Sequence, residues 1–454
     1  MFFYYLMPII FIIGIMGIAL EDVIKVNKAA TAVGMSILLW LIFLLNAEHF
    51  FVINPPKHIA EYTKVFPQLA EMSIHDVAFD FLELHLVKGL GDVSTTLFFV
   101  LGSMAIIDVV DSHGGFSVIL HSIKSNGQRR LLWIMSLLTF FMSILLGNLP
   151  TVIVLVSIVR KLVPERDVRM IFASMIVIAA NAGGSCSPIG DVTTLLLWTG
   201  GNITALHQLK TLFVPSFVML LLPLSIAMMM LPKGAMVTRE VSETINVNPR
   251  MRQIVLLVGL GSLAMVPVLQ TLIQLPPFMG VLLGLVILWV ITDRMYADSH
   301  DEALQNLRVQ RVFSRVDIST VFFFLGILMS VQALVVTGQL AIMAKFLSNT
   351  CANENVIAVV LGVLSSFLDN VALVSATMGM YPLQLDGVFA VDSSFWTLLA
   401  YCAVNGGSIL IIGSAAGVTV MGMEKIGFVY YLKRFTPLAL LGFFAGVLVY
   451  ILII

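Results

Sequence analysis

The chain has 454 residues, of which 59% are hydrophobic and 11% are charged, and its mean hydropathy is +1.02. Soluble domains carry about 25% charged residues, so this composition excludes a water-soluble globular protein and predicts an integral membrane protein. The net charge of −1 argues against a nucleic-acid-binding protein, and the three cysteines show neither CxxC nor metal-ligand spacing.

Apolar stretches that are long enough to span a bilayer recur along the chain. The first, residues 2–20, lacks the basic start of a cleaved signal peptide and is predicted to be a membrane helix. The mixed stretch 46–92 is expected to be a loop with an amphipathic helix. The other predicted spans are 29–45, 93–107, 131–159, 170–206, 211–231, 253–292 (two spans with a break near QTLIQLPP), 318–344, 355–385, 393–423 and 436–454.

Two of these stretches are predicted to enter the membrane and return on the same side. Residues 131–159 are broken by Gly147 and Pro150, and basic residues flank both ends, which is typical of cytoplasmic loops. Residues 355–385 contain one charged residue, Asp369, and their flanks are poor in basic residues, so this hairpin is predicted to enter from outside. The resulting topology places both termini outside and all but five of the 25 lysines and arginines in the cytoplasm. A single kinked helix in either place would reverse everything downstream.

The two halves of the chain resemble each other. SILLGNLPTV (143–152) is matched by SSFLDNVALV (365–374), and NAGGSCSPIGDVTT (181–194) is matched by NGGSILIIGSAAGVT (405–419). Because the two hairpins enter from opposite sides, the repeats are predicted to be inverted, which is typical of secondary transporters. The predicted parts are N-terminal helices and loop (1–92), repeat 1 (93–231; hairpin 131–159, broken helix 170–199), connecting helices and a cytoplasmic loop (232–317), and repeat 2 (318–454; hairpin 355–385, broken helix 393–423).

Asp369 and Asp191 are the carboxylates of these apolar motifs, which contain no lysine or arginine. A charged side chain near the bilayer centre costs at least about 2.5–3.5 kcal/mol, so such residues usually serve a function. Glycine-rich breaks free backbone carbonyls that bind small cations. Burial favours the neutral acid and a bound cation favours the carboxylate, so a proton and a cation would displace each other. The alternative is that both residues only cap half-helices.

LLGNLPTVIVLV, NAGGSCSPIGDVTTLLLW, SSFLDNVALV and NGGSILIIGSAAGV resemble motifs of the NhaD family of sodium/proton antiporters, in the ion transporter superfamily. The resemblance covers most of the chain from about residue 80. It implies an all-helical polytopic protein of the cell (inner) membrane, with a scaffold domain, a transport domain and elevator-like motion. It also implies exchange of Na+ or Li+ for H+, a homodimer, no cofactor and no enzymatic activity. One difference is Gly147, where the family usually has aspartate.

The predicted functional residues fall into two groups. The cation- and proton-binding residues, which include those that the family resemblance implies, are Asp369, Asn370, Ser365, Asn148, Ser143, Asn181, Asp191, Thr193, Thr194, Asn405 and Ser408. The candidate pH-sensing residues, which flank the span 93–107, are His85, Asp92, Asp108 and His113. For this second group, an ordinary position at the membrane interface is the alternative.

Other functions stay open at this point. A sodium-coupled carboxylate symporter or an arsenite exporter would share the same architecture, although two unneutralised aspartates disfavour an anionic substrate. The spans show no histidine pair for haem, no cysteine cluster and no embedded lysine or glutamate for a quinone, so a membrane enzyme or redox subunit is not indicated. A passive channel is disfavoured because inverted repeats suit alternating access.

Overall fold

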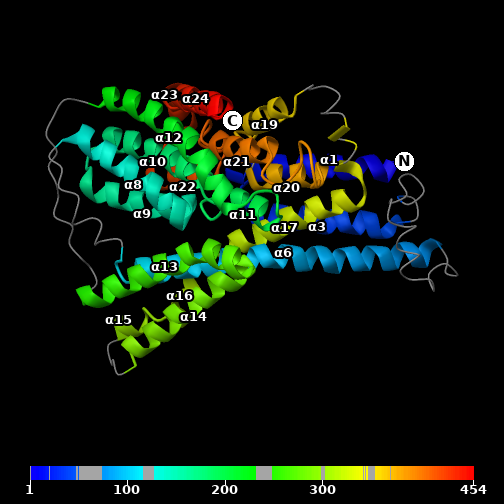
Figure 1. The fold of residues 1–454 in the computed structure, drawn as a ribbon, viewed down its shortest axis with the longest axis horizontal. Helices are drawn as coiled ribbons and strands as arrows, with labels where there is room; N and C mark the ends of the chain where they lie inside the picture. Colours follow the sequence, from blue (N-terminus) through cyan, green and yellow to red (C-terminus); the bar gives the residue numbers. More distant parts are fainter. Residues whose placement is uncertain are drawn as a thin grey trace. The chain divides into compact units, whose positions relative to one another are not determined.

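The computed structural model describes residues 2–19, 21–47, 50, 74–115, 127–231, 248–297, 302–340, 342, 344–345, 353–368 and 370–453. Over these residues the regular structure is helical, and no β-strand longer than an isolated bridge is present (Figure 1). Nine of the described helices are long and apolar enough to cross a membrane. This agrees with the all-helical polytopic fold that the composition predicts.

The helices keep the labels of Figure 1. Those of the first half are α1 (Phe2–Ala19), α2 (Glu21–Ile24), α3 (Lys28–Leu45), α6 (Ile74–Ser112), α8 (Gln128–Leu146), α9 (Asn148–Leu162), α10 (Arg166–Ser185), α11 (Val192–Thr199) and α12 (Ala205–Met230). Those of the second half are α13 (Pro249–Ile273), α14 (Pro277–Met295), α15 (Glu302–Gln305), α16 (Val309–Val312), η2 (Phe313–Arg315), α17 (Ile318–Val336), α19 (Glu354–Leu364), α20 (Asn370–Met380), α21 (Ser394–Gly406), α22 (Ala415–Glu424), α23 (Phe428–Arg434) and α24 (Thr436–Ile453).

The helix boundaries follow local sequence signals. Asn27 caps α3 by accepting a hydrogen bond from the backbone N–H of Ala29, at 2.8 Å. The predicted break in 253–292 lies where α13 ends and Gln274 adopts a left-handed conformation. Pro276 and Pro277 then begin α14, as proline favours the first helical positions.

The helix that is expected within the mixed stretch 46–92 occupies its last part, residues 74–92. This part is the start of α6, which continues without interruption to Ser112. The segment contains no proline, and the two glycines at 89 and 91 do not end the helix. Its charged side chains Glu83, Lys88 and Asp92 lie exposed, so they do not oppose helix formation. The difference from the prediction is that this helix and the predicted span 93–107 form one continuous helix.

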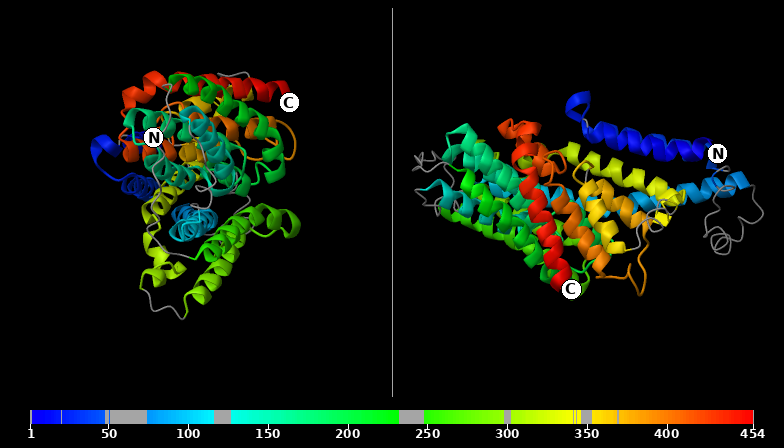
Figure 2. Two further views of the ribbon diagram at one scale, coloured as in Figure 1. Left: turned by 90° about the vertical axis from the view of Figure 1, so that its left-hand side faces the viewer. Right: turned by 90° about the horizontal axis from the view of Figure 1, so that it is seen from above.

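The chain forms two compact units, each described by itself. The first comprises Met1–Leu97, Asp317–Ile357 and Val371–Leu383. In it, α3 packs closely on α17, and the Trp40 indole donates to the Met329 carbonyl at 2.9 Å. The second unit comprises Phe98–Val316, Ala358–Asn370 and Gln384–Ile454, and in it α12 packs against α24 from the other half of the chain (Figure 2). Packing defines these units, whereas sequence similarity defines the repeats, so the domain boundaries given above stay a prediction.

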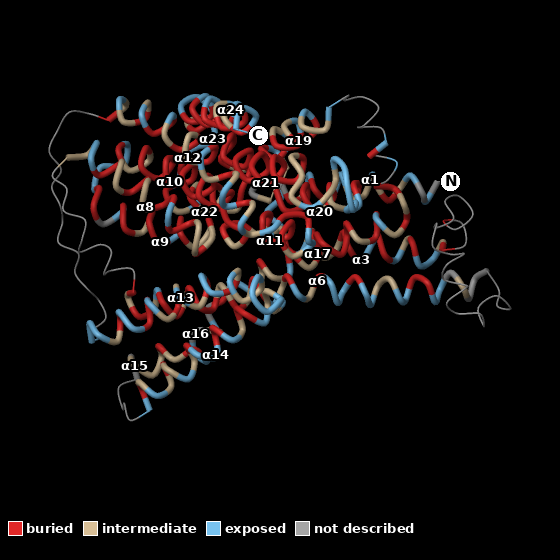
Figure 3. The backbone as a smooth tube through the Cα atoms, in the orientation of Figure 1, coloured by how far each residue is buried: buried red, intermediate tan, exposed pale blue. Residues whose placement is uncertain are grey.

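Two half-helices lie at the centre of the second unit. The last turns of α10, residues 171–185, and nearly all of α21, residues 395–406, are buried (Figure 3). Each is approached by a neighbouring helix at backbone distance. A Cβ atom at Gly183 of α10 would lie 2.1 Å from the Phe140 carbonyl oxygen of α8, and one at Gly406 of α21 would lie 1.9 Å from the Gly362 carbonyl oxygen of α19. The lack of a side chain at these two glycines therefore allows both pairs of helices to pack this closely.

Candidate cation-binding site

Two helices of the second unit are interrupted where the sequence predicts broken helices. α10 ends at Ser185 and α11 begins at Val192, while α21 ends at Gly406 and α22 begins at Ala415. A polar side chain caps each restart: the Asp191 carboxylate accepts from the Thr193 N–H at 2.7 Å, and the Ser414 hydroxyl accepts from the Gly417 N–H at 3.2 Å. The structural counterpart of Asp191 is therefore Ser414.

Asp191 is the point at which three segments meet. Its side chain is buried, and one of its carboxylate oxygens accepts a short hydrogen bond from the Asn148 amide. The Asn370 amide lies 3.3 and 3.5 Å from its two oxygens. Asn148 begins α9 and Asn370 begins α20, so the starts of both predicted hairpin return arms lie at one carboxylate. Asp191 thus caps α11, as the alternative interpretation expects, and also joins both tips.

A chain of side-chain amides and hydroxyls links the two halves. The Asn148 amide donates to the Asn181 side-chain oxygen at 2.9 Å. Asn181 in turn donates to the hydroxyls of Ser408 at 2.8 Å and Ser414 at 3.1 Å. Because these residues are buried, the network fixes the side-chain orientations around the break.

Asn405 occupies the position equivalent to Asn181 in the second half. Its amide donates to the Ser185 hydroxyl at 3.0 Å and to the Tyr401 carbonyl at 2.9 Å. Its side-chain oxygen is buried and has no hydrogen-bond partner among the described residues. The Thr193 hydroxyl is in the same situation. Neutral oxygens of this kind, together with a carboxylate, are the ligands that a small hard cation prefers.

The two predicted serines play the same role in each half. The Ser143 hydroxyl of α8 donates to the Ala180 carbonyl of α10 at 2.6 Å. The Ser365 hydroxyl, just after α19, donates to the Ala403 carbonyl of α21 at 2.7 Å. Each serine therefore joins the helix before a tip to the buried half-helix that carries the site asparagine. Thr194, another predicted residue, donates to the carbonyls of Ser187 and Asp191 and stabilises the start of α11.

Comparison with known proteins shows the family of the chain. Residues 5–400 match the model of the CitMHS family, described as citrate transporter. The chain is 40% identical to sodium/proton antiporter 1 of Arabidopsis thaliana, covering 98% of this chain and 72% of that protein. It is 30% identical to the Na(+)/H(+) antiporter NhaD of Vibrio cholerae, covering 79% of this chain and 78% of that protein. The chain belongs to the NhaD-type sodium/proton antiporter family.

This membership confirms the family resemblance and the multi-pass membrane location. A second Arabidopsis relative, sodium/proton antiporter 2, is 37% identical over 98% of both proteins. The fold of the NhaD-type chain is also similar to that of the YdaH transporter of Alcanivorax borkumensis, with a TM-score of 0.54 and 15% identity. The match covers 93% of this chain and 98% of YdaH, and it supports the fold alone.

Not every predicted residue can be placed. Asp369, the second predicted carboxylate of the site, lies outside the described residues. Two residues that the prediction missed, Ser185 and Ser414, complete the network. The sequence held a signal for both. With Gly190–Asp191 aligned to Gly413–Ser414, Ser414 takes the place of Asp191, and Ser185 takes the place of Ser408.

The four candidate pH-sensing residues are distributed along α6 and the turn that follows it. His85 contacts the Phe81 carbonyl through Nδ1 at 2.8 Å, and Asp92 is exposed, whereas Asp108 is partly buried. His113 is fully buried, its Nδ1 lies 2.7 Å from the Val109 carbonyl, and its ring stacks on Tyr296. Burial lowers the pKa of His113, and the bond to Val109 opposes this only in part. A sensing role for these residues stays a prediction.

Proposed function

We propose that this protein exchanges Na+ or Li+ for H+ across the membrane, with both ions binding in turn around Asp191. The observation that carries the proposal is the position of Asp191, where the Asn148 and Asn370 amides and the start of α11 meet at one buried carboxylate. The names of relatives that are 40% and 37% identical, which are sodium/proton antiporters, support the same activity.

The proposed chemistry is competition for a carboxylate. In its charged form, Asp191 is stabilised by donors from two amides and from the N-terminal end of α11, whose partial charge is positive. A cation would be held by this carboxylate and by neutral oxygens, with Thr193 and Asn405 as candidates because each has a buried side-chain oxygen with no hydrogen-bond partner in the described part of the chain. A proton that binds the carboxylate removes its charge and releases the cation, and a new cation releases the proton. Asp369 is the proposed second acid of this site.

The finer architecture is also part of the proposal. The chain would consist of two inverted repeats with re-entrant hairpins whose tips are at Asn148 and Asn370. The reciprocal hydrogen bonds Asn181–Ser408 and Asn405–Ser185 support such a relation, because equivalent residues of the two halves make equivalent contacts. We further propose that the site moves with a transport domain in an elevator-like motion and that the protein acts as a homodimer.

A second candidate is transport of a carboxylate, since the matching family model is described as citrate transporter. An anion would have to bind beside the Asp191 carboxylate, and this repulsion favours the cation. This repulsion does not argue against an arsenite exporter to the same extent, because arsenite is neutral near pH 7. The experiment below therefore includes both compounds.

The test uses everted membrane vesicles from a host that lacks its own sodium/proton antiporters. A respiratory pH gradient quenches a fluorescent amine, and addition of NaCl or LiCl is expected to restore the fluorescence. Choline chloride is the control for salt, and vesicles without the protein are the control for leakage. Absence of dequenching over the range pH 6.5–9 in vesicles that contain the inserted protein would overturn the proposal. Sodium-dependent uptake of labelled citrate, or export of arsenite, would favour the alternatives.

A further inference from the structure

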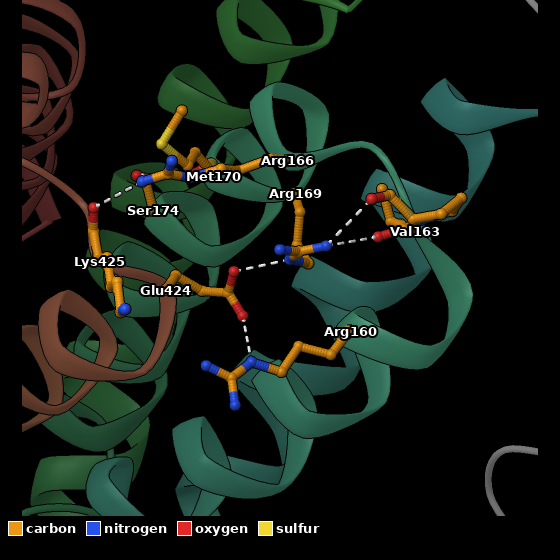
Figure 4. A network of polar contacts seen from close by, with 9 residues as sticks. Arg160, Val163, Arg166, Arg169, Met170, Ser174, Glu424 and Lys425 are labelled. Atoms are coloured by element: carbon orange, nitrogen blue, oxygen red, sulfur yellow. Dashed lines mark hydrogen bonds and ion pairs between the residues drawn. The ribbon is translucent and has the colours of Figure 1, made fainter.

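The buried carboxylate of Glu424 forms an ion cluster with two more exposed arginines where three helices end. It is the last residue of α22, and 1% of its side chain is exposed. Its two carboxylate oxygens accept from Arg160 Nε at 2.5 Å, near the end of α9, and from Arg169 Nε at 2.6 Å, in the first turn of α10 (Figure 4). Arg169 also donates to the Val163 and Pro164 carbonyls, at 3.2 Å each. One carboxylate thus joins α22, α9 and the loop between α9 and α10.

The positions of these charges indicate that the cluster is specific. Glu424 lies at the C-terminal end of α22, where the partial negative charge of the helix disfavours a carboxylate. Arg169 lies in the N-terminal turn of α10, where the partial positive charge disfavours a cation. The partial charge of its own helix end therefore stabilises neither Glu424 nor Arg169. Each of the two charges is stabilised by the other instead.

The same three helices also meet at their opposite ends. Asn148 begins α9, Asn181 lies near the end of α10, and Ser414 caps the start of α22. The Asn148–Asn181 and Asn181–Ser414 hydrogen bonds, at 2.9 and 3.1 Å, join these ends. Between the ends, α9, α10 and α22 pack against one another in all three pairings. α9 has 15 residues and is therefore about 22 Å long.

We propose that Glu424 is a positioning residue which, through Arg160 and Arg169, holds α9, α10 and α22 as one rigid body throughout the exchange cycle. This inference rests on the proposed function, since the geometry that it maintains is the approach of the Asn148 amide to Asp191 at the far end of α9. Helices are stiff, so a displacement of α9 at Arg160 reaches Asn148, and small displacements in a binding site weaken binding strongly. The cluster of Glu424, Arg160 and Arg169 therefore stays formed in every state of the exchange cycle and does not open and close with transport.

The first experiment compares Glu424→Gln with Glu165→Gln. Glu165 precedes α10, is exposed and makes no capping hydrogen bond, so its substitution makes the same chemical change beside the cluster. Sodium-dependent exchange is measured against Na+ concentration. For Glu424→Gln the half-saturating Na+ concentration is expected to rise about tenfold, with the maximal rate little changed, because binding geometry is lost while the acid that exchanges protons remains. Glu165→Gln is expected to match the unchanged protein. An unchanged half-saturating concentration in Glu424→Gln overturns the inference.

The second experiment separates positioning from folding. Glu424→Gln leaves the 44% exposed Arg160 and the 20% exposed Arg169 without their carboxylate, which lowers the stability of the folded protein mainly through the less exposed Arg169. The triple variant Glu424→Gln, Arg160→Gln, Arg169→Gln removes all three charges and is expected to recover thermal stability, because no uncompensated charge remains. Its half-saturating Na+ concentration is expected to stay raised. If this value returns to normal together with stability, Glu424 has a structural role only and the inference fails.

The two experiments also distinguish this failure from failure of the proposed function. If the unchanged protein and Glu165→Gln do not exchange Na+ for H+, the proposed function is wrong. If both exchange normally and the Glu424 variants bind Na+ equally well, only the positioning role is wrong.

Discussion

The Asn181 amide donates a hydrogen bond of 2.8 Å to the Ser408 hydroxyl, which joins the helix break of the first half of the chain to that of the second half. The bond has a reciprocal, because the Asn405 amide donates to the Ser185 hydroxyl at 3.0 Å. Asn181 and Asn405 align in the sequence, as do Ser185 and Ser408. The asparagine at the helix break of each half therefore takes a hydrogen-bond acceptor from the other half.

Asp191→Asn is expected to abolish exchange. An asparagine oxygen can still accept from the Thr193 N–H, so the cap of α11 is retained. The added amide, however, places a donor opposite the Asn148 and Asn370 amides and removes the titratable group. We expect a loss of about 1 kcal/mol in stability from this mismatch. Dequenching assays and thermal melting in detergent check both effects, with the exposed Asp386→Asn as the matched control.

Asp369→Asn is expected to abolish exchange while the protein inserts and melts normally. Asp369 lies outside the described residues, so the reason is chemical: it is the second acid of the proposed site, and competition with a proton needs a titratable group. The assay is Na+-induced dequenching at equal amounts of inserted protein. Exchange at the normal rate in this variant would leave Asp191 as the coupling acid by itself.

Gly147→Asp is expected to change the apparent Na+ affinity or the pH profile of exchange. The Gly147 backbone, at φ +86° and ψ 158°, has a conformation that is almost restricted to glycine, so any side chain costs about 1–3 kcal/mol. A Cβ there would lie 3.7 Å from the Ile189 carbonyl oxygen, so space is available beside the break. Gly147→Ala shares the backbone strain and lacks the acid, and is the matched control. Exchange is measured against Na+ concentration and against pH for both variants. If the two variants give the same Na+ dependence and the same pH dependence, the tip at Gly147 does not face the ion.

Single-cysteine labelling is expected to find residues 160–169 and residues 386–392 on opposite sides of the membrane. Both regions contain exposed side chains, among them Arg160, Glu165, Asp386 and Val391, so a membrane-impermeant reagent can reach either. In right-side-out vesicles, cysteine at 386 or 391 should react, and cysteine at 160 or 165 should react only after permeabilisation. Labelling of both regions from one side would refute the inverted hairpins.

His113 is expected to make the stability of the folded protein depend on pH. Its buried ring has a lowered pKa in the folded state, whereas the unfolded chain binds a proton near the ordinary value of 6.5. The stabilising contribution is therefore fully present above about pH 6.5 and falls by up to about 1.4 kcal/mol per pH unit below it, until the folded state is protonated too. Melting temperatures between pH 7.5 and 5.5 should show this decrease. It should be reduced in His113→Phe, which keeps a ring to stack on Tyr296.

The helix breaks and the central polar residues could be predicted from the sequence. Glycines and prolines in otherwise apolar stretches mark the breaks after Leu146 and Ser185, and both lie where expected. The similarity of the two halves predicts Asn181 and Asn405 as equivalent residues of one site. Polar residues inside apolar spans are costly, so they reveal a site with little help from three-dimensional information.

Other features could not be predicted, for physical reasons. Arg160 and Arg169 are basic residues at the end of a hairpin, and such residues also occur in cytoplasmic loops for reasons of topology alone. Their common partner, Glu424, lies more than 250 residues further along the chain, and only packing brings the three together. The start of α6 and its continuity with the span 93–107 could not be predicted, because its first turns are polar and local polarity does not tell an exposed helix from a loop.

The backbone contacts of Gly183 and Gly406 have a consequence for engineering. Replacement of a helical glycine by alanine usually stabilises a protein by about 0.4–1 kcal/mol when the methyl group has room. At these two positions the methyl group would collide with a neighbouring carbonyl, so the contact between the helices would have to open. A Cβ would meet nothing within 4 Å at Gly34, Gly91, Gly261 or Gly422, each inside a helix. A thermostable variant for experimental structure determination is therefore to be sought among those four positions.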